Sequence, residues 1–575
     1  YSRNCRNDFI MMKKLLLILL CLPFIGFGQI WETELLKNNK DATFLEKKIA
    51  FENYRTKYPD KKGYNPYARL IDFLETRIDK DGKYPLDKLY REWKKEKEKY
   101  TNSNSFSFSN WEELASYSEP RGAGRINTIE FDPIDSNIIW IGAASGGLWK
   151  TIDGGSNWTT NTDDLPVISI SAITINPSNT QEMLIATGDP IQGAYTSSIG
   201  VLRSIDGGIS WDTTGLNETV FDLEMNPNHP DSIFAGTITG IMLSIDGGIN
   251  WNVVYSIPSG GVTQQTGLNM VDLEFMPGNT DVIYAAARMN YGSGDSSPYR
   301  SIDGGVTWAV IDSGLLPGRY NIEIAVTNDN PNVIYAVFSD ILSQYHGLYK
   351  SSNMGDNWIL QSATPNILVA NGWYNLSLAV DPTNESNVFV GGIPHNYSSD
   401  NGQNWEHNGM ATTHGDQHYA KFNPLNNSLF IANDGGIYKY APYGDTVFFL
   451  NQLWVLPSWI NMNSNLRIAQ FYKLGLSATN PDKLVGGTQD NGTQMFNNST
   501  LSRIYDKDGM ECAIDQLNEN KIFACTQWGG LRRNDDISDT LSLWNNIYPV
   551  NMDDYNFRVS FQKEKTIASS SAFVN

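Results

Sequence analysis

The chain has 575 residues, a formal net charge of −20, 12% aromatic residues and 4 cysteines. An excess of carboxylates of this size argues against nucleic acid or an anionic membrane as the partner, because both attract basic surfaces. An acidic, well-solvated surface that keeps an exported protein in solution is the simpler interpretation.

The N-terminal region predicts export. Residues 13–29, KKLLLILLCLPFIGFGQ, have a basic start, an apolar run too short to span a membrane comfortably and a small-x-small end. We expect a signal peptide over 11–28, a secreted or cell-surface protein, and no transmembrane span after cleavage. Residues 1–10, before Met11, are interpreted as a non-native leader.

The next part of the chain differs from the remainder in composition. Residues 29–100 are rich in Lys and Glu at helical spacing, as in LDKLYREWKKEKEKY, and predict a short helical segment. The polar stretch TNSNSFSFSN over 101–110 predicts a linker.

A repeated phrase, S/T-x-D-x-G-x-x-W, is the strongest structural signal in the sequence. Its copies are TIDGGSNW (151–158), SIDGGISW (204–211), SIDGGINW (244–251), SIDGGVTW (301–308), SSNMGDNW (351–358) and SSDNGQNW (398–405). In such a turn a short Asp or Asn side chain caps backbone N–H groups, Gly adopts a positive φ and Trp packs beneath the loop. Structural roles are therefore expected for Asp153, Asp206, Asp246, Asp303, Asn353 and Asp400.

The phrase resembles the Asp-box (BNR repeat) of sialidases, the sortilin group and tandem-propeller xyloglucan hydrolases. The resemblance implies an all-β fold, a β-propeller of four-stranded blades. Alternating apolar strands continue beyond the last copy to nine units, and FRVSF at 557–561 begins another. Since this exceeds one ordinary ring, we expect tandem propellers over 111–440 and 441–575, the second truncated; a single large ring, as in the sortilin group, is the alternative.

Propeller topology places function on the face opposite these turns. Long insertions there carry Tyr195, Tyr291 and Tyr345, which could offer flat rings to sugars or peptides, unless the loops are merely variable and solvated. Further ligand-binding candidates on this face are Arg121 and Arg125 of PRGAGRIN and Trp528 of TQWGG.

The segment HGDQH is the sharpest chemical signal. If it is extended, His414, Asp416 and His418 share one face and could begin a divalent-metal site. The alternative is a hydrogen-bonded brace in which Asp416 fixes the histidine tautomers. No cofactor is assured by the sequence.

Acidic turns recur at equivalent blade positions on the same face. They contain Asp434 in NDGG, Asp490 in TQDNG and Asp508 in YDKDGM. With Asp416 these carboxylates could converge as the catalytic pair of an inverting glycosidase. Asp beside Gly is also ordinary turn chemistry, so each carboxylate has a structural alternative.

The run HGDQH, NDGG, GGTQDNG and DGMECAID resembles secreted bacterial Asp-box proteins labelled glycosidase-like or sortilin-like. The catalytic residues of the named enzymes do not carry over. The Arg-Ile-Pro signature of sialidases is broken at Asn127, and Ala144 stands where xyloglucan hydrolases place a first-blade Asp. The sequence therefore favours a propeller that binds glycans or extracellular proteins through its loops, without assured catalysis. The alternatives are a glycoside hydrolase for a neutral polysaccharide and a metal-supported adhesion module.

Two cysteines fall within the expected second propeller. Cys512 and Cys525 flank the turn DQLNENK at nearly matching distances, which places them facing one another on adjacent strands. A disulfide and a pair of thiols both remain open.

Overall fold

The structure is a computed structural model that describes part of the chain. The described residues are 43–58, 78, 92, 94–95, 116–117, 122–190, 198–256, 268–289, 295–369, 371–407, 413–449, 452–497, 500–526, 530–539 and 542–547. Expectations for the leader, the signal peptide, the linker and the segment FRVSF lie outside these residues.

The chain divides into a small unit, composed of residues 1–92, 258–267 and 290–293, and a large unit that contains all the sheets. In the small unit, helix α3 spans Phe44–Lys57. Thr43 begins it with a capping box, because its hydroxyl accepts from Glu46 N while the Glu46 carboxylate accepts from Thr43 N at 2.7 Å. A helical element in the predicted N-terminal segment is thus confirmed.

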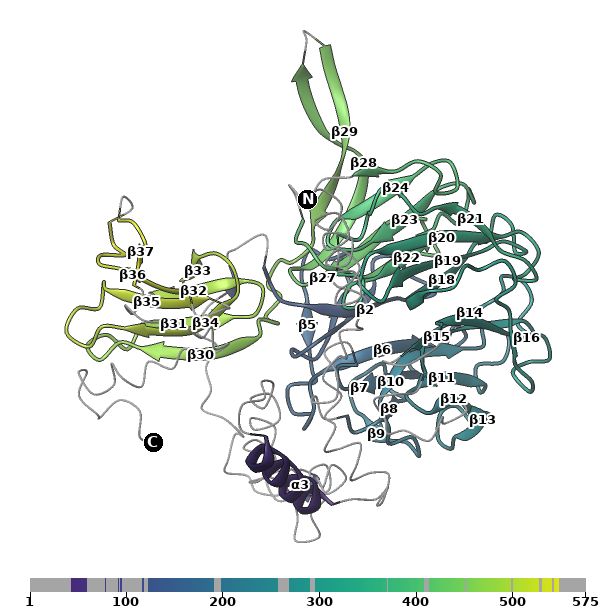
Figure 1. Cartoon of the computed structure of the whole chain (residues 1–575), viewed down its shortest axis with the longest axis horizontal. Coiled ribbons are helices and arrows are strands. Elements are labelled where there is room, and N and C mark those ends of the chain that lie inside the picture. Colours follow the sequence, from purple (N-terminus) through teal and green to yellow (C-terminus); the bar gives the residue numbers. More distant parts are fainter. Residues whose placement is uncertain are drawn as a thin grey trace, which may run out of the picture. The chain divides into compact units, whose positions relative to one another are not determined.

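The large unit is built of antiparallel sheets whose strands follow chain order, as expected for propeller blades (Figure 1). Blade 1 contains β2 (Ile126–Phe131), β3 (Ile139–Ala143), β4 (Leu148–Thr151) and β5 (Thr159–Thr160). Blade 2 contains β6 (Ile170–Ile175), β7 (Met183–Thr187), β8 (Val201–Ser204) and β9 (Asp212–Thr213). Blade 3 contains β10 (Val220–Met225), β11 (Ile233–Thr237), β12 (Gly240–Ser244) and β13 (Asn252–Ser256). Blade 4 contains β14 (Leu268–Phe275), β15 (Ile283–Met289), β16 (Ser297–Ser301) and β17 (Ala309–Val310).

The remaining sheets follow the same plan. Blade 5 contains β18 (Arg319–Val326), β19 (Ile334–Asp340), β20 (Tyr345–Ser351) and β21 (Ile359–Ser362). Blade 6 contains β22 (Ser377–Val380), β23 (Val388–Gly391), β24 (His395–Ser398) and β25 (Glu406–His407). Blade 7 contains β26 (Gln417–Phe422), β27 (Leu429–Asn433), β28 (Gly436–Phe449) and β29 (Gln452–Asn461). Blade 7 therefore continues beyond residue 440, where the sequence placed the end of the first propeller.

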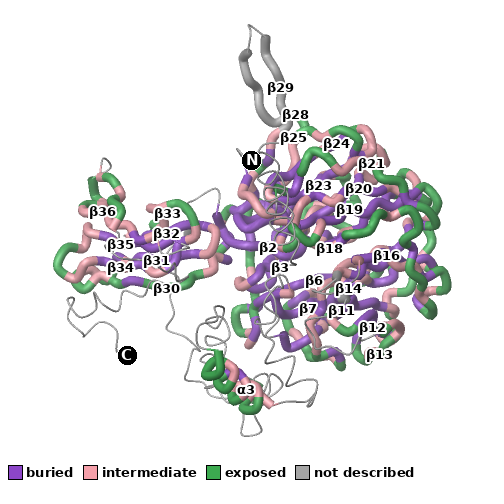
Figure 2. The backbone as a smooth tube through the Cα atoms, in the orientation of Figure 1, coloured by how far each residue is buried: buried purple, intermediate pink, exposed green. Residues whose placement is uncertain are grey.

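Blades 1 to 7 form a closed ring. Their inner strands β2, β6, β10, β14, β18, β22 and β26 are neighbours in that order, and β26 in turn lies against β2. Figure 2 shows the strands of the ring largely buried and the outer turns exposed. Strands such as β6 and β7 are buried along their whole length, whereas β10 alternates between buried and partly exposed residues.

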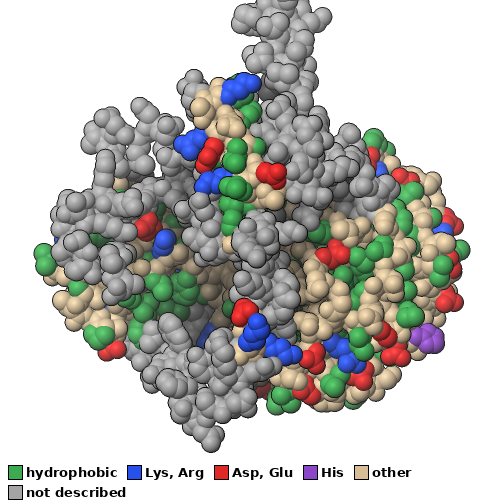
Figure 3. All heavy atoms as spheres, turned by 90° about the horizontal axis from the view of Figure 1, so that it is seen from below, with side chains coloured by type: hydrophobic (Ala, Val, Ile, Leu, Met, Phe, Trp, Pro, Cys, Tyr) green, Lys and Arg blue, Asp and Glu red, His purple; other side chains and the backbone are tan. Residues whose placement is uncertain are grey.

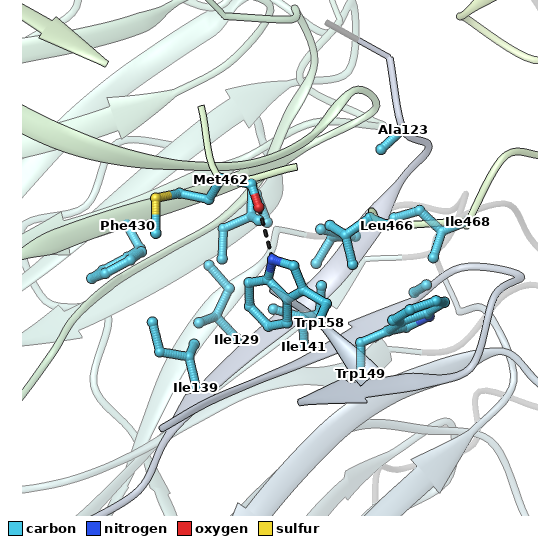
Figure 4. Close-up of a cluster of buried hydrophobic side chains, with 14 of the residues drawn as sticks. Ala123, Ile129, Ile139, Ile141, Trp149, Trp158, Phe430, Met462, Leu466 and Ile468 are labelled. Carbon is cyan, nitrogen blue, oxygen red and sulfur yellow. Dashed lines mark hydrogen bonds between the residues drawn. The ribbon is translucent and has the colours of Figure 1, made fainter. Parts of the chain in front are cut away.

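A hydrophobic cluster joins the first and last blades of the ring. Trp158 lies at its centre, 1% exposed, with Ile129 and Ile141 of blade 1 and Phe430 of blade 7 around it (Figure 4). Its indole Nε1 donates to Met462 O at 2.7 Å. The buried indole therefore fastens the residues after β29 to blade 1.

Two further sheets follow the ring. Blade 8 contains β30 (Phe471–Leu476), β31 (Lys483–Thr488), β32 (Gly492–Asn497) and β33 (Thr500–Tyr505), and β1 (Ser116–Tyr117) pairs with β33 in parallel. Blade 9 contains β34 (Gly509–Ile514), β35 (Ile522–Thr526), β36 (Gly530–Asn534) and β37 (Asn545–Asn546). The prediction of an all-β, β-propeller fold is confirmed, and within the described residues two four-stranded blades follow the closed ring.

The repeated turns connect the third and fourth strands of blades 1 to 6. In the first, Thr151 Oγ1 donates to Asp153 Oδ1 (2.8 Å) and accepts from Gly155 N (2.9 Å), while Asp153 Oδ1 accepts from Asn157 N (2.9 Å). The same three contacts recur in the other copies, which begin at Ser204, Ser244, Ser301, Ser351 and Ser398. The Asp and Asn side chains of these turns are thus used by the turns themselves.

Near the ring axis, carboxylates link neighbouring blades. Asp222 Oδ2 accepts from Leu273 N at 2.9 Å, and Asp272 Oδ2 accepts from Ile324 N at 2.9 Å, in each case on the inner strand of the next blade. Lys421 forms an ion pair with Glu130 where blade 7 meets blade 1. On the outer surface the acidic side chains are spread among hydrophobic and polar ones on the face seen in Figure 3.

The two cysteines of blade 9 are buried and form no disulfide. The expectation that they face one another is wrong, because β34 pairs with β35 in a register that places Cys512 opposite Ala524, while Cys525 lies opposite Leu531 on β36. Within the described part of the chain, no helix is long and apolar enough to cross a membrane.

Candidate functional site

The candidate site lies at one end of the blades. Antiparallel connections alternate between the two ends of a sheet, so the loops between second and third strands, and those that lead into inner strands, lie opposite the repeated turns. The loops belong to blades 1, 2, 6, 7, 8 and 9. They supply, together with His418 at the start of β26, the side chains of Arg125, Asp189, Asn371, Tyr374, Asn375, His414, Asp416, Asp434, Asp490 and Asp508. The sequence predicted this face, and we call this set the carboxyl site.

A buried polar chain forms the base of the carboxyl site. The Arg125 guanidinium is ion-paired with Asp189, and each side chain is only 1% exposed. Arg125 also donates to the Tyr374 hydroxyl at 3.0 Å, which donates to Asp434 Oδ2 at 2.9 Å. His418 Nε2 lies 2.8 Å from Asp434 Oδ1. Residues from four blades are thereby fixed around one carboxylate.

These contacts determine the charge of Asp434. Burial alone would raise the pKa of its carboxyl, but the neighbouring His418 and the Arg125 guanidinium lower that pKa below its ordinary value. Burial, followed by the Asp434 charge, raises the pKa of Tyr374 well above its usual range. Asp434 is therefore an ionised acceptor, and Tyr374 keeps its proton as the donor.

The HGDQH segment does not form one face. Asp416 has a left-handed backbone, with φ of 60°, and the register of β26 shifts between Gln417 and Tyr419, so period-two alternation is broken. His414 Nε2 lies 3.0 Å from Asp490 O, and Asp416 Oδ1 accepts from the amides of Asn371, at 2.9 Å, and Asn375. Each of the three side chains therefore has a different partner.

Both interpretations of HGDQH need correction. His418 is held by Asp434 rather than by Asp416, so Asp416 does not fix its tautomer. As for the metal site expected at His414, Asp416 and His418, the described residues contain no group of three or more His, Cys, Asp or Glu side chains arranged to hold an ion. The segment instead distributes its polar side chains over three parts of the carboxyl site.

A second pair of carboxyls completes the carboxyl site: Asp490 lies between β31 and β32 of blade 8, and Asp508 lies in the loop that leads from blade 8 into β34 of blade 9. Asp490 N donates to Asp508 Oδ1 at 3.1 Å, and Asn491 Nδ2 donates to Asp434 O at 2.9 Å. On the ring side, Gly435 is required because a Cβ there would lie 2.4 Å from His414 Cβ. The glycine of NDGG thus lets His414 reach the backbone of the Asp490 loop.

Asp434 and Asp490 differ in their protonation state. Burial, then the Asp434 charge and the hydrogen bond with Asp508, raise the pKa of Asp490 to about 9. Burial and Asp434 also raise the pKa of Asp416. The site therefore holds an ionised carboxylate, Asp434, whose charge helps to keep the Asp490 carboxyl protonated at neutral pH.

The remaining ligand-binding predictions have mixed outcomes. Arg125 belongs to the carboxyl site but is 1% exposed, so it supports the site from below. The prediction for Tyr345 is wrong, because its ring is 5% exposed, packs against Trp405 and bonds Ser362 Oγ through its hydroxyl. Four further candidates lie outside the described residues: Arg121, Tyr195, Tyr291 and Trp528.

Sequence reasoning missed the loop 371–375, NGWYN. It provides Tyr374 and both amide donors to Asp416, together with Trp373, whose ring is 48% exposed and 5.4 Å from that of Tyr374. The one available signal was the adjacent aromatic pair in a segment that leads into an inner strand.

Comparison with known proteins finds distant relatives of the chain. No family model matches the chain. A xyloglucanase of Paenibacillus sp is 24% identical over 302 residues, which are 47% of this chain and 28% of that protein. Xyloglucanase Xgh74A of Acetivibrio thermocellus is 25% identical over 331 residues, which are 50% of this chain and 38% of that protein. The chain thus spans well under half the length of these curated relatives.

Solved structures confirm the fold. The GH74 xyloglucanase from Xanthomonas campestris has a TM-score of 0.53 at 16% identity, covering 77% of this chain and 76% of that one. An ancestral GH74 enzyme has a TM-score of 0.53 at 16% identity, covering 76% and 64%. The chain is therefore a β-propeller protein with distant similarity to xyloglucanases.

Proposed function

We propose that the carboxyl site hydrolyses glycosidic bonds of a neutral polysaccharide. The observation that carries the proposal is the convergence of Asp416 and Asp434, from the ring, with Asp490 and Asp508, from the loops of blades 8 and 9, on one loop face. The xyloglucanases named above act on a neutral polysaccharide, which supports the same substrate class here.

Asp490 is the proposed general acid. Its carboxyl is partly exposed and keeps its proton below a pKa of about 9, so it can give that proton to the glycosidic oxygen as the bond to C1 breaks. A water molecule adds to C1, and Asp416, which is also partly exposed, takes up the proton of that water. The amides of Asn371 and Asn375 hold the Asp416 carboxylate in place for this step.

Asp434 has a different part in this scheme. Its side chain is 1% exposed and both oxygens are occupied by Tyr374 and His418, so it cannot receive a proton from water at a sugar ring. Its fixed negative charge instead favours the protonated form of Asp490. This replaces the expectation that Asp434 itself is a reacting carboxylate.

The test is release of reducing ends from xyloglucan, mixed-linkage β-glucan and glucomannan. Loss of the general acid in Asp490→Asn is expected to lower kcat about 10²- to 10⁴-fold. Activity of the unsubstituted protein is expected to fall above about pH 9, as Asp490 loses its proton. The control is Asp535→Asn, at a half-exposed ion pair of blade 9. Undiminished cleavage by Asp490→Asn would contradict the assignment.

Binding without turnover is the second candidate, and Ala144 favours it. This buried residue stands where the resembling xyloglucan hydrolases place a catalytic Asp, and its backbone is bonded to Arg125 O and to Ser169 Oγ. Binding of these polysaccharides with no release of reducing ends at any pH between 4 and 9 would decide for this candidate.

A further inference from the structure

An exposed apolar surface lies on the same loop face, over blades 5 and 6. It consists of Leu316 (52% exposed), Ile341 (69%), Leu342 (71%), Val369 (51%) and Trp373 (48%). These residues belong to three successive loops, between β17 and β18, between β19 and β20, and between β21 and β22. We call them the apolar strip. Exposed apolar groups gathered in this way are typical of binding surfaces.

The three loops are tied together by hydrogen bonds. Gly372 N donates to Ser343 O at 3.0 Å, and Tyr345 N donates to Asn366 Oδ1 at 2.9 Å. His346 Nε2 lies 3.0 Å from Pro317 O. Because backbone and side-chain contacts cross both boundaries between the loops, the apolar strip is preformed.

The chemistry of the strip suits an uncharged ligand. Residues 363–375, ATPNILVANGWYN, include no charged side chain. Asp340, the last residue of β19, uses its carboxylate to accept from Leu342 N (2.9 Å) and Gln344 N (2.8 Å) of the neighbouring loop. Apolar faces beside amide side chains match a pyranose chain, which presents C–H faces and neutral hydroxyls.

The strip is continuous with the carboxyl site. Trp373 follows Asn371, the donor to Asp416, by two positions, and its ring lies 5.4 Å from that of Tyr374, the donor to Asp434. A chain stacked on Trp373 would therefore have its next sugars beside the carboxyls.

We propose that the apolar strip is an extended binding track for a neutral glycan chain, with Trp373 as the stacking platform nearest the carboxyl site. This rests on the proposed function for the identity of the ligand as a glycan, although not on hydrolysis. The track accounts for the exposed aliphatic side chains of Leu342 and Val369 on this face.

The experiment measures affinity for soluble xyloglucan, mixed-linkage β-glucan and glucomannan in the Asp490→Asn background, where cleavage cannot distort binding. Adding Trp373→Ala is expected to weaken binding of at least one of these about 10- to 30-fold. Adding Leu342→Ser is expected to weaken binding of the polymer but not of its disaccharide. The matched control is Ile245→Ser, an apolar side chain that is 69% exposed in a repeated turn at the other end of the blades.

The outcomes separate the two proposals. If binding depends on Trp373 but the unsubstituted protein cleaves none of the polysaccharides, the binding track is supported and the hydrolase proposal is contradicted. If the unsubstituted protein cleaves a polymer but Trp373→Ala does not change the affinity for that polymer, the hydrolase proposal is supported and the binding track is overturned. Failure of the unsubstituted protein to bind any of the three polysaccharides, or equal losses in Ile245→Ser, would also overturn the track.

Discussion

At the residue scale, a group of charged side chains is buried beneath the carboxyl site. Arg125, Asp189, Asp434 and His418 all lie beneath the loop face with side chains about 1% exposed. Isolated charges in such a setting cost several kcal/mol, and only their mutual pairing makes burial tolerable. The resulting rigidity positions Tyr374 and, through it, the loop that holds Asp416.

The ion pair of Arg125 and Asp189 gives the first prediction. Asp189→Asn leaves the guanidinium buried opposite a neutral amide, so the free energy of unfolding is expected to fall by about 3 to 5 kcal/mol. Asp535→Asn, which removes an ion pair with 40% and 46% exposed side chains, is expected to change it by about 0 to 1 kcal/mol. Urea unfolding followed by tryptophan fluorescence measures both. Equal effects of the two substitutions would show that Asp189 does not neutralise Arg125.

The sequence could identify the acidic residues of the site but not their partners. Asp434, Asp490 and Asp508 were found because they lie in glycine-containing turns that recur along the blades, and Asp416 was found in the segment HGDQH. Arg125 and Tyr374 are 249 positions apart, and no local pattern relates them. The left-handed backbone at Asp416 was also not predictable from HGDQH, which is why the expected alternation failed.

At the element scale, each repeated turn is a unit of local hydrogen bonds with a tryptophan attached. The tryptophans are not equally packed: Trp158 and Trp358 are 1% and 2% exposed, whereas Trp251 and Trp308 are half-buried. The buried ones also donate to backbone outside their own turn, to Met462 O and Ile311 O. Tryptophans at the same position of the sequence pattern thus differ in burial and in hydrogen bonding.

This difference predicts graded effects on stability. Trp158→Ala is expected to lower the free energy of unfolding by about 3 to 5 kcal/mol, because a fully buried aromatic ring is removed from the cluster that joins blades 1 and 7. Trp308→Ala is expected to cost clearly less, because its ring is partly solvated and its Nε1 donates only within its own turn, to Gly305 O at 3.0 Å. Thermal unfolding of the two variants compares them, and a larger loss for Trp308→Ala would refute this ranking.

The positions of the blades were predicted correctly where the turn phrase is present and less accurately where it is absent. Blades 1 to 6 carry the turn phrase and were located from it. Blade 7 has no copy, and its outer strands β28 and β29 are 14 and 10 residues long, so its end was placed too early. Without a turn signal, a strand pattern alone does not indicate where a blade finishes.

At the scale of the whole molecule, the ring holds a group of carboxyls near its axis. Burial raises the pKa of Asp222 to about 6 and that of Asp272 to about 7. The same cause raises the pKa values of Glu224, Glu274 and Glu323 well above their ordinary value. The folded ring therefore retains protons that the unfolded chain releases near pH 4.

The consequence is a stability that falls as pH rises. Between about pH 4 and pH 7 the folded state binds more protons than the unfolded state, so the free energy of unfolding decreases across this interval. The turn carboxyls act in the opposite sense: hydrogen bonds from Asn157 lower the pKa of Asp153 to about 2, and the stability that this ionised carboxylate contributes is lost as the pH falls from about 4 to about 2.

The unfolding temperature is expected to be highest near pH 4 to 5. Asp272→Asn, which cannot ionise, should flatten the decline from pH 5 to 7, and an unfolding temperature that rises from pH 5 to 8 would exclude this mechanism.

The fastening of Trp158 to Met462 and Asn465 also has a consequence for how the protein is made. Met462 and Asn465 follow Trp158 by 304 and 307 positions. The surface of blade 1 that packs against blade 7 therefore stays exposed until residues beyond 460 have been synthesised. During synthesis, blades 1 to 6 would form an open arc that exposes Ile129, Ile141 and the Trp158 indole at one edge. Such an arc is a target for wrong partners, including a second nascent arc. Closure of the ring buries this exposed edge. A chaperone that holds the unfinished chain would be needed most just before closure.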